Sequence, residues 1–204
     1  VISRNLVPDV LAELKPYDIV LTTSEDHRTA LKEQYFGTAR RLEKTVKRKL
    51  ELPIRFERLP RGVDIKTFSP QDKALARRQC QLPEDRFIVL SVGRLVVSDK
   101  MDIMPVLKGL KRLISADPKA GEQFLLVLRG EQIWTNYGDI LRQQIAKLDL
   151  IDYVTFSPSS PLPALYAAAD VFIAPSDAAT ENFGLTVIEA MAAGTPAVVS
   201  DWDG

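Results

Sequence analysis

Two glutamates stand on either side of a glycine near the end of the chain, in a segment that follows one apolar run and precedes another. Glu181 comes before Gly184, and Glu189 comes after it within a predicted helix over residues 185–193. The first amides of a helix have no partners within it, and a glycine has no Cβ to keep an anion away. A strand, a short loop and a helix that opens at a glycine therefore predict a site for a negatively charged ligand.

Glu189 is the only charged residue in this helix, which is otherwise apolar almost all round. Such a helix is expected to be buried, and a buried carboxylate is costly unless another group hydrogen-bonds it. One interpretation is that Glu189 lies on a narrow solvated face. We favour contact with a polar ligand, because Glu181 lies in the preceding loop and the first helix amides lie between the two carboxylates.

The order of motifs along the chain resembles the donor-site signature of glycosyltransferase family 4. Members of that family are retaining enzymes of the GT-B fold that use nucleotide-diphosphate sugars. The two glutamates surround Phe-Gly-Leu, and residues 189–196 follow the pattern Glu-Ala-Met-Ala-x-Gly-x-Pro. The resemblance covers nearly everything from about residue 60 onward. It also rests on three upstream segments, which are Gly62-Val63-Asp64 with Phe68 and Pro70, Ser91-Val92-Gly93-Arg94-Leu95 with Lys100, and Leu165-Tyr166-Ala167-Ala168-Ala169-Asp170.

The resemblance implies a role for each matching residue. An arginine and a lysine placed like Arg94 and Lys100 grip the donor diphosphate in that family, the first with a planar fork and the second with a mobile point charge. Glu181 would hold the hydroxyls of the donor sugar, so that Glu181, Arg94 and Lys100 are the implied catalytic residues. Glu189 would accept the ribose hydroxyls. The other implied donor-binding residues are Asn182, Phe183, Gly184, Leu185 and Thr186, with the amides of Gly184 and Leu185 on the phosphates.

No metal ion and no cofactor is expected beyond the nucleotide-sugar co-substrate, because two cations and a helix terminus can neutralise a leaving diphosphate. The alternative is a metal at Asp201-Trp202-Asp203, whose Asp-x-Asp spacing binds metal in a different glycosyltransferase fold. Such a tripeptide is a weak signal.

The chain also departs from the family pattern, since the loop before Glu181 is longer than usual. Arg129-Gly130-Glu131 stands where a glycine-rich turn is common, which leaves recognition of the base open.

Composition excludes several classes of protein. The formal net charge is zero, from 27 basic and 27 acidic residues, so nucleic acid is not an expected partner. The single cysteine, Cys80, excludes a disulfide within the chain and fits a reducing compartment. No apolar run approaches the ~20 residues of a membrane span. A cytoplasmic location is therefore expected.

Residues 39–50 are strongly basic and are expected to lie on a helix with a thin apolar stripe. One interpretation is peripheral contact with the inner face of an anionic membrane. A solvated outer helix is the alternative, and we favour it on the sequence alone. The basic residues are Arg40, Arg41, Lys44, Lys47, Arg48 and Lys49.

The elements that must position these residues are apolar strands separated by helices. Strands are predicted at 18–22, 55–59, 87–92, 124–128, 153–156, 171–174 and 197–200. Continuous apolar strands with helices between them predict a parallel sheet covered on both faces, which is an α/β, Rossmann-like doubly wound fold. Ligands of such sheets lie beyond the carboxyl ends of the strands. Arg94, Arg129 and Glu181 all follow predicted strand ends and are therefore expected on one rim.

We divide the chain into three parts. Residues 1–60 are expected to be the C-terminal part of an acceptor lobe, residues 61–85 a hinge and linker, and residues 86–204 a nucleotide-sugar-binding lobe that is incomplete at its C-terminus. The chain opens with Val1 rather than methionine and stops at Gly204 directly after a predicted strand. We therefore expect a fragment, cut at both ends, of a two-lobed GT-B enzyme.

The expected function is transfer of a sugar from a nucleotide-diphosphate sugar to an acceptor that is a sugar, a lipid or a small molecule. Two alternatives use the same site. One is a nucleotide-sugar enzyme that transfers nothing, such as an epimerase, and the other is a binding-only fragment, because one lobe cannot assemble a closed active site. The sequence leaves open the sugar, the base and the acceptor.

Overall fold

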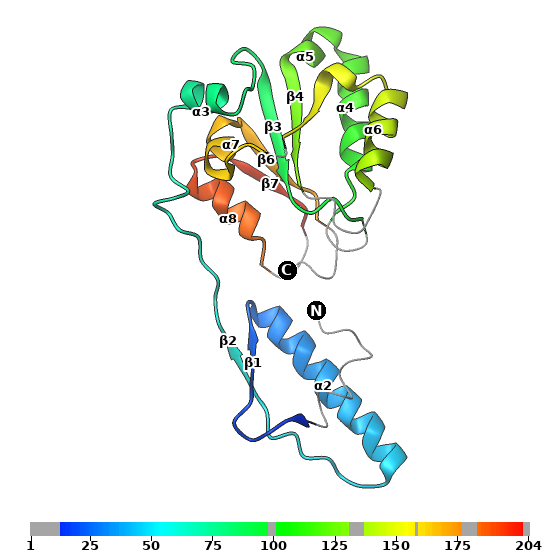
Figure 1. Ribbon diagram of the computed structural model, residues 1–204. Coiled ribbons are helices and arrows are strands. Elements are labelled where there is room, and N and C mark those ends of the chain that lie inside the picture. The colour runs from blue at the N-terminus through cyan, green and yellow to red at the C-terminus, as the bar shows by residue number, and fades with distance from the viewer. Residues whose placement is uncertain (1–12, 98–100, 131–136, 158, 177–182, 202–204) are drawn as a thin grey trace. The chain divides into compact units, whose positions relative to one another are not determined.

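The computed structural model describes residues 13–97, 101–130, 137–157, 159–176 and 183–201. The chain divides into two compact units, with the boundary between Arg61 and Gly62 (Figure 1). The sequence-based assignment of these units to an acceptor lobe and a donor lobe stays a prediction. None of the helices in the described ranges is long and apolar enough to cross a membrane.

The first unit is a small sheet with one long helix against it. Strands β1 (Ile19–Thr22) and β2 (Arg55–Arg58) run parallel, and helix α2 (Glu25–Val46) connects them. The hydroxyl of Ser24 accepts a hydrogen bond from the amide of His27 (3.1 Å) and so fixes the start of α2. The sequence predicts one helix that ends at about residue 35 and a second over roughly residues 38–50. Instead α2 continues through Thr38, whose side chain is buried. The core of this unit is Leu31, Tyr35, Ile54 and Phe56.

The second unit contains a sheet whose five described strands are all parallel, in the order β5-β4-β3-β6-β7. The chain enters this sheet at its centre, continues to one side through β4 and β5, and then returns to the other side of β3. The order therefore reverses between β3 and β6, and this switch point is where ligands of doubly wound sheets bind. The strands are β3 (Phe87–Val92), β4 (Phe124–Arg129), β5 (Val154–Phe156), β6 (Val171–Ala174) and β7 (Ala197–Val199).

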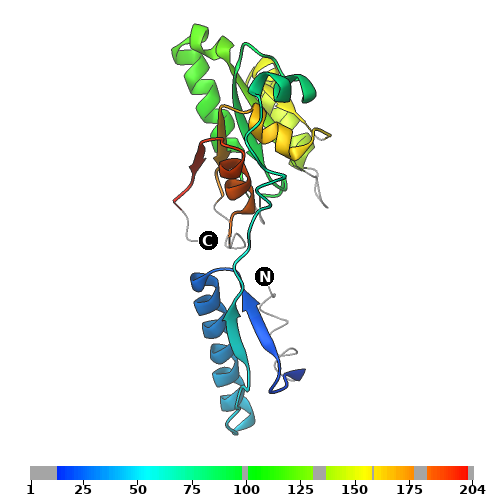
Figure 2. The ribbon, with the colours of Figure 1, turned by 90° about the vertical axis from the view of Figure 1, so that its left-hand side faces the viewer.

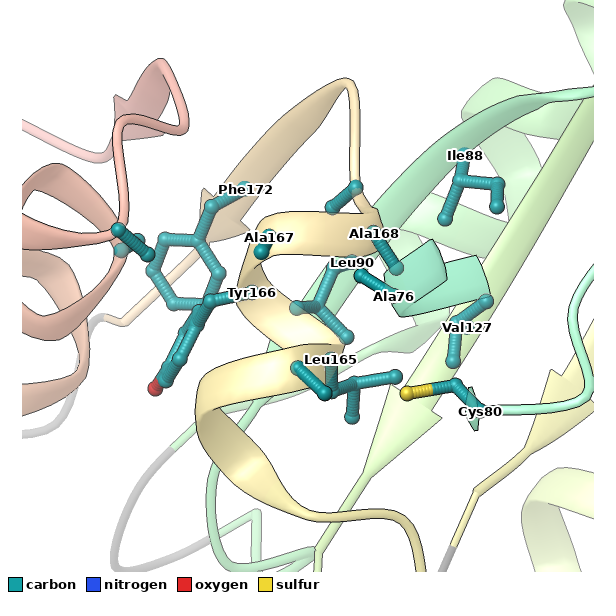
Figure 3. Packing of buried hydrophobic residues seen from close by; sticks show 14 of the residues in the cluster. Ala76, Cys80, Ile88, Leu90, Val127, Leu165, Tyr166, Ala167, Ala168 and Phe172 are labelled. Carbon is teal, nitrogen blue, oxygen red and sulfur yellow. The ribbon is translucent and has the colours of Figure 1, made fainter. Parts of the chain in front are cut away.

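Helices cover both faces of this sheet (Figures 1 and 2). Helices α4 (Met104–Ala116) and α6 (Tyr137–Lys147) place Leu107 and Leu141 in one buried cluster with Leu126 and Leu128 of β4. Helices α3 (Lys73–Gln79), α7 (Leu162–Ala168) and α8 (Leu185–Ala192) build the other cluster, part of which Figure 3 shows. The doubly wound α/β fold is thereby confirmed. The described part of this unit also contains two short elements, α5 (Pro118–Gln123) and the 3-10 turn η1 (Ile151–Tyr153).

Helix α3 is attached to the second unit by an ion pair. The Arg77 side chain is 8% exposed and donates to Asp170 (2.6 Å), to the carbonyl of Ala168 (3.1 Å) and to that of Glu84 (2.7 Å). Lys73 also pairs with Asp170, at 2.8 Å. The segment predicted as hinge and linker, 61–85, thus includes a helix that belongs to the core of the second unit. A hinge role for this segment stays a prediction.

Candidate functional site

The carboxyl ends of β3 and β6 lie side by side, because these strands are parallel neighbours. Arg94 follows β3 and has an exposed side chain, and Gly184 opens the helix that follows β6. The sheet therefore brings Arg94 and the N-terminus of α8 to the same rim, on the two sides of the switch point. This is the location that the sequence predicts for an anionic ligand.

The loop that carries Arg94 is packed against the loop that follows β4. The amide of Gly93 donates to the carbonyl of Arg129 (2.9 Å), which extends the pairing with β4 one residue past the end of β3. A Cβ atom on Gly130 would overlap the carbonyl oxygen of Gly93 and would lie 3.2 Å from Cγ of Leu95. Only a glycine at position 130 lets the two backbones approach this closely. The turn at Arg129-Gly130 therefore supports the backbone on both sides of Arg94.

A buried tyrosine anchors the start of α4. The hydroxyl of Tyr137 donates to Oδ1 of Asp102 (2.7 Å) and accepts from the amide of Ile103 (3.0 Å). The same carboxylate oxygen accepts from the amide of Met104 (2.9 Å). Burial, with the hydrogen bond to Asp102, raises the pKa of Tyr137 to about 12. The tyrosine therefore stays a donor at neutral pH and ties α6 to the segment just after Lys100.

Met101 connects this segment to the loop after β6. Its side chain is buried, its backbone pairs with that of Ser176 in an isolated antiparallel bridge, and its sulfur lies 3.7 Å from the hydroxyl of Ser91. The hydroxyl of Ser200 in turn donates to the carbonyl of Ser176. The loops that follow β3, β6 and β7 are thus held together at the switch point.

Helix α8 begins at a glycine in a left-handed conformation. Gly184 has φ 71° and ψ 49°, and its carbonyl accepts from the amide of Val187 (2.9 Å). The amides of Leu185 and Thr186 precede this first bond of the helix and lie at its N-terminus, where the helix dipole favours an anion. Contrary to the prediction of a buried helix, Ala190 is its only buried residue among those described, and Met191 is 63% exposed. The helix packs one side on α7 and leaves much of its surface open, so apolar composition alone overstated its burial.

Glu189 is held by a tyrosine from α7. The hydroxyl of Tyr166 donates to Oε2 of Glu189 (2.8 Å), and the tyrosine itself is fully buried. Burial first, and then the hydrogen bond to this carboxylate, raise the pKa of Tyr166. The tyrosine ring packs edge-on against Phe68 and Phe172, with centroids 5.9 and 5.6 Å away, and Figure 3 shows it beside Phe172. One oxygen of Glu189 is therefore fixed by a rigid donor, which orients the other.

The C-terminal end of α8 is fixed to the same tyrosine. Gly194 has φ 80°, the amide of Thr195 donates to the carbonyl of Ala190 (2.9 Å), and the hydroxyl of Thr195 donates to the carbonyl of Tyr166 (2.7 Å). A Cβ on Gly194 would meet Cγ of Pro70 at 3.4 Å. A left-handed glycine thus closes the helix as well as opening it, and both ends of α8 are defined.

The structure describes some of the predicted site residues and not others. The described residues are Arg94, Phe183, Gly184, Leu185, Thr186 and Glu189. Arg94 follows β3, and the other five lie directly before α8 or within it. Lys100, Glu181 and Asn182 lie outside the described residues, as do the last two residues of Asp201-Trp202-Asp203. Within the described ranges, no group of three or more His, Cys, Asp or Glu side chains could hold a metal ion.

Three supporting residues were not assigned roles from the sequence. Tyr166 belongs to the motif at residues 165–170. The expectation that a buried Glu189 needs a hydrogen-bond donor could have pointed to it. Asp102 and Tyr137 are 35 positions apart and carry no shared motif. Their pairing follows only from the fold.

Comparisons with known proteins agree with this architecture. Residues 72–204 match the family described as glycosyl transferases group 1. A D-inositol 3-phosphate glycosyltransferase from Thermobifida fusca is 33% identical over 153 residues, which are 72% of this chain and 34% of that protein. The protein of the same name from Acidothermus cellulolyticus is 37% identical, over 72% of this chain and 33% of its own length. The chain therefore spans about a third of the curated relatives it matches.

Solved structures show the same fold. HepE from Anabaena, in complex with UDP and glucose, superimposes with a TM-score of 0.72 at 23% identity, over 99% of this chain and 50% of that one. Sucrose-phosphate synthase from Thermosynechococcus elongatus superimposes with a TM-score of 0.62 at 28% identity, over 99% of this chain and 45% of that one. With the family match over residues 72–204, the parallel sheet and the rim at its switch point, the chain belongs to the group 1 glycosyl transferases.

Proposed function

We propose that this chain carries the donor site of a retaining family 4 glycosyltransferase, which moves a sugar from a nucleotide-diphosphate sugar to an acceptor without a metal ion. The observation that carries the proposal is the position of Arg94 and the N-terminus of α8 on the two sides of the switch point. A cation and a helix terminus at that point suit a diphosphate. The acceptor is a sugar, a lipid or a small molecule.

The diphosphate is gripped by Arg94 and Lys100 and by the amides of Gly184 and Leu185. These groups supply the charge that a metal ion supplies elsewhere, so donor binding should be unaffected by EDTA. The leaving diphosphate also balances the positive charge that develops at the anomeric carbon of the sugar in the transition state. Asn182, Phe183 and Thr186 complete the surroundings of the donor.

The two glutamates divide the rest of the donor between them. Glu189 accepts the ribose hydroxyls with the oxygen that Tyr166 leaves available, since Tyr166 bonds only Oε2. Glu181 holds the hydroxyls of the transferred sugar and is needed for turnover. UDP is the nucleotide to test first, because HepE is described in complex with UDP and glucose.

We place the protein in the cytoplasm. Its one cysteine, Cys80, is buried and is not in a disulfide, and burial raises the pKa of its thiol. A buried thiol of raised pKa is a poor nucleophile and suits a reducing compartment.

Calorimetry with bare and sugar-bearing nucleotides tests the proposal. The chain is titrated with UDP, GDP and ADP, and then with UDP-glucose, in the presence of EDTA. Glu189→Gln should weaken UDP and UDP-glucose alike, because both contain ribose. Glu181→Gln should bind UDP nearly normally and lose affinity for UDP-glucose. Equal weakening of both ligands by both variants would refute the division of roles, and binding of none of the nucleotides by the wild-type chain would refute the donor site itself.

The reaction class is tested in a longer protein that includes this chain. Adding the donor with candidate acceptors should give a glycosylated product with the donor's anomeric configuration retained. Isomerisation of the donor without transfer would identify an epimerase-like enzyme instead, and binding without turnover would identify a binding protein.

A further inference from the structure

Helix α2 is much longer than the sheet on which it packs. Its 22 residues extend over ~33 Å at 1.5 Å per residue, whereas each four-residue strand of the unit covers only ~13 Å. The buried residues of α2 end at Ala39. From Arg40 to Val46 every residue is exposed or half-buried, and Val46 is 55% exposed. The last two turns of α2 therefore bury little of themselves in the unit that the structure describes.

Six of the twelve lysines and arginines among residues 13–61 lie between positions 40 and 49, in these turns and directly after them. Arg40, Arg41, Lys44, Lys47, Arg48 and Lys49 are all exposed. We call residues 40–49 the cationic end of α2. The dipole of a helix favours cations near its C-terminus, but this effect is confined to the last turn. It accounts for Lys44 and not for the whole set.

Cations from the end of α2 and from the turn that follows it line one hollow. Lys47 ends the helix in a left-handed conformation (φ 52°), and the carboxylate of Glu43 accepts a hydrogen bond from the amide of Leu50 (2.8 Å), which fixes the turn. A hollow of about 460 Å³ is lined by Arg40, Lys44, Lys47, Arg48 and Lys49, with Glu43 as the one acid in its lining. Five cations against one carboxylate make a strongly positive concave surface.

This surface fits phosphate groups presented by a membrane. The chain as a whole has no net charge, so the cations are a local feature rather than a general affinity for polyanions. Clusters of four to eight lysines and arginines on a helix are attracted to anionic lipid headgroups. The exposed Val46 at the end of the helix adds an apolar group next to the cations, as in helices that lie at a membrane interface.

We propose that the cationic end of α2 docks on an anionic phospholipid surface. The headgroup phosphates enter the hollow between Arg40 and Lys49, while Arg41 lies on the adjoining helix surface. The proposal concerns the first unit and is independent of the donor site, so it stands or fails separately from the proposed function.

Vesicle sedimentation tests this proposal with the whole chain. Vesicles of phosphatidylcholine alone are compared with vesicles of phosphatidylcholine and phosphatidylglycerol in equal amounts. The wild-type protein should sediment with the anionic vesicles and not with the neutral ones, and binding should fall as salt is added. The triple variant Lys47→Glu, Arg48→Glu, Lys49→Glu should lose about a hundredfold or more in partitioning.

A matched control carries the same change of charge elsewhere. Lys108→Glu, Arg112→Glu and Lys119→Glu alter three exposed cations of the second unit and should leave vesicle binding within a few-fold of the wild type. The neutral triple Lys47→Gln, Arg48→Gln, Lys49→Gln, with helix content checked by circular dichroism, separates loss of charge from loss of fold. Equal loss in the test and control variants would overturn the proposal, as would equal binding to neutral vesicles.

Inorganic phosphate tests whether the hollow binds a free phosphate anion instead of a lipid headgroup. If calorimetry shows binding of inorganic phosphate while the protein does not sediment with the anionic vesicles, the hollow takes a free anion and the membrane proposal is wrong.

Discussion

At the scale of single residues, Tyr166 connects the core of the second unit with the proposed donor site. Its ring lies between Phe68 and Phe172, its carbonyl accepts from Thr195, and its hydroxyl reaches Glu189. A carboxylate on a half-exposed helix would otherwise rotate freely. Because its partner is fully buried and held on several sides, Glu189 is presented in one orientation without a ligand.

Tyr166→Phe keeps the packing and removes only the hydroxyl. The variant should fold, and its affinity for UDP should fall by roughly 0.5–1.5 kcal/mol, the net value of one hydrogen bond. Calorimetry measures the affinity, and Tyr153→Phe, which alters a half-buried tyrosine elsewhere in the unit, is the control. In a Glu189→Gln background the added effect of Tyr166→Phe should shrink, since the two side chains act as one unit. An undiminished effect there would show that Tyr166 acts by another route.

At the scale of elements, the contact between the loops after β3 and β4 sets the position of Arg94. Gly130→Ala would place a methyl group against the carbonyl of Gly93 and force that backbone to move. The affinity for UDP should fall about tenfold or more, equivalent to about 1.4 kcal/mol. Gly109→Ala makes the same chemical change in α4, where a Cβ meets open space, and should raise stability by about 0.5–1 kcal/mol without changing affinity.

A double-mutant cycle shows whether Gly130 acts through Arg94. In an Arg94→Ala background, Gly130→Ala should cost little further affinity, because the side chain that it would misplace is already gone. Hydrogen exchange gives a readout without ligand. The amide hydrogen of Gly93, which bonds the carbonyl of Arg129, should exchange faster in Gly130→Ala than in the wild type. Additive losses in the cycle, or unchanged exchange at Gly93, would contradict this role.

The ion pair between α3 and the loop before β6 makes stability depend on pH. Burial alone would raise the pKa of Asp170, but the hydrogen bonds from Lys73 and the amide of Ile88, with the charge of Arg77, hold it below its usual value. A carboxyl whose pKa is lowered by folding stabilises the protein above its unfolded pKa of about 3.9. That stabilisation is lost as the pH falls through the folded-state pKa.

Asp170→Asn should therefore lower the free energy of unfolding by about 3 kcal/mol at neutral pH, because it leaves Arg77 buried without its carboxylate. The difference from the wild type should narrow as the pH falls below about 4. Asp139→Asn, which breaks an exposed ion pair with Arg142, should cost less than about 1 kcal/mol. Urea unfolding measures the free energy of unfolding of both variants. Equal losses would show that the ion pair of Arg77 stabilises the protein no more than an exposed ion pair does.

The predicted strands are confirmed to within about a residue or two. Most of them are apolar runs bounded by turn-forming or charged residues, and β2, which has Phe56 as its one apolar residue, is the exception. The errors have physical causes. Two helices are predicted, with a break between about residues 35 and 38, but Thr38 and Ala39 are buried and α2 is continuous there. Helix α8 is apolar and still half-exposed, since composition does not say how much of a helix finds a partner. Contacts between distant positions, such as Tyr166 with Glu189, depend on the tertiary fold and not on any local pattern.

At the scale of the whole molecule, we propose ligand binding by the second unit and membrane contact by the first. The two activities rest on different charges, with Arg94 and Lys100 in one and residues 40–49 in the other. Each should therefore survive the loss of the other. The vesicle-binding triple variant should bind UDP as the wild type does, and Arg94→Ala should bind vesicles as the wild type does.

The central claim is that this chain binds a nucleoside diphosphate through Arg94 without a metal ion. Calorimetric titration of UDP in EDTA tests it most directly, with wild type, Arg94→Ala, Lys100→Ala and the control Arg112→Ala, which alters an exposed arginine on α4. We expect the wild type and Arg112→Ala to bind equally. Arg94→Ala and Lys100→Ala should each lose roughly 1.5–3 kcal/mol of binding free energy, the range for a hydrogen bond to a charged group. Wild-type affinity in both of these variants, or binding that needs added magnesium or manganese, would contradict the account.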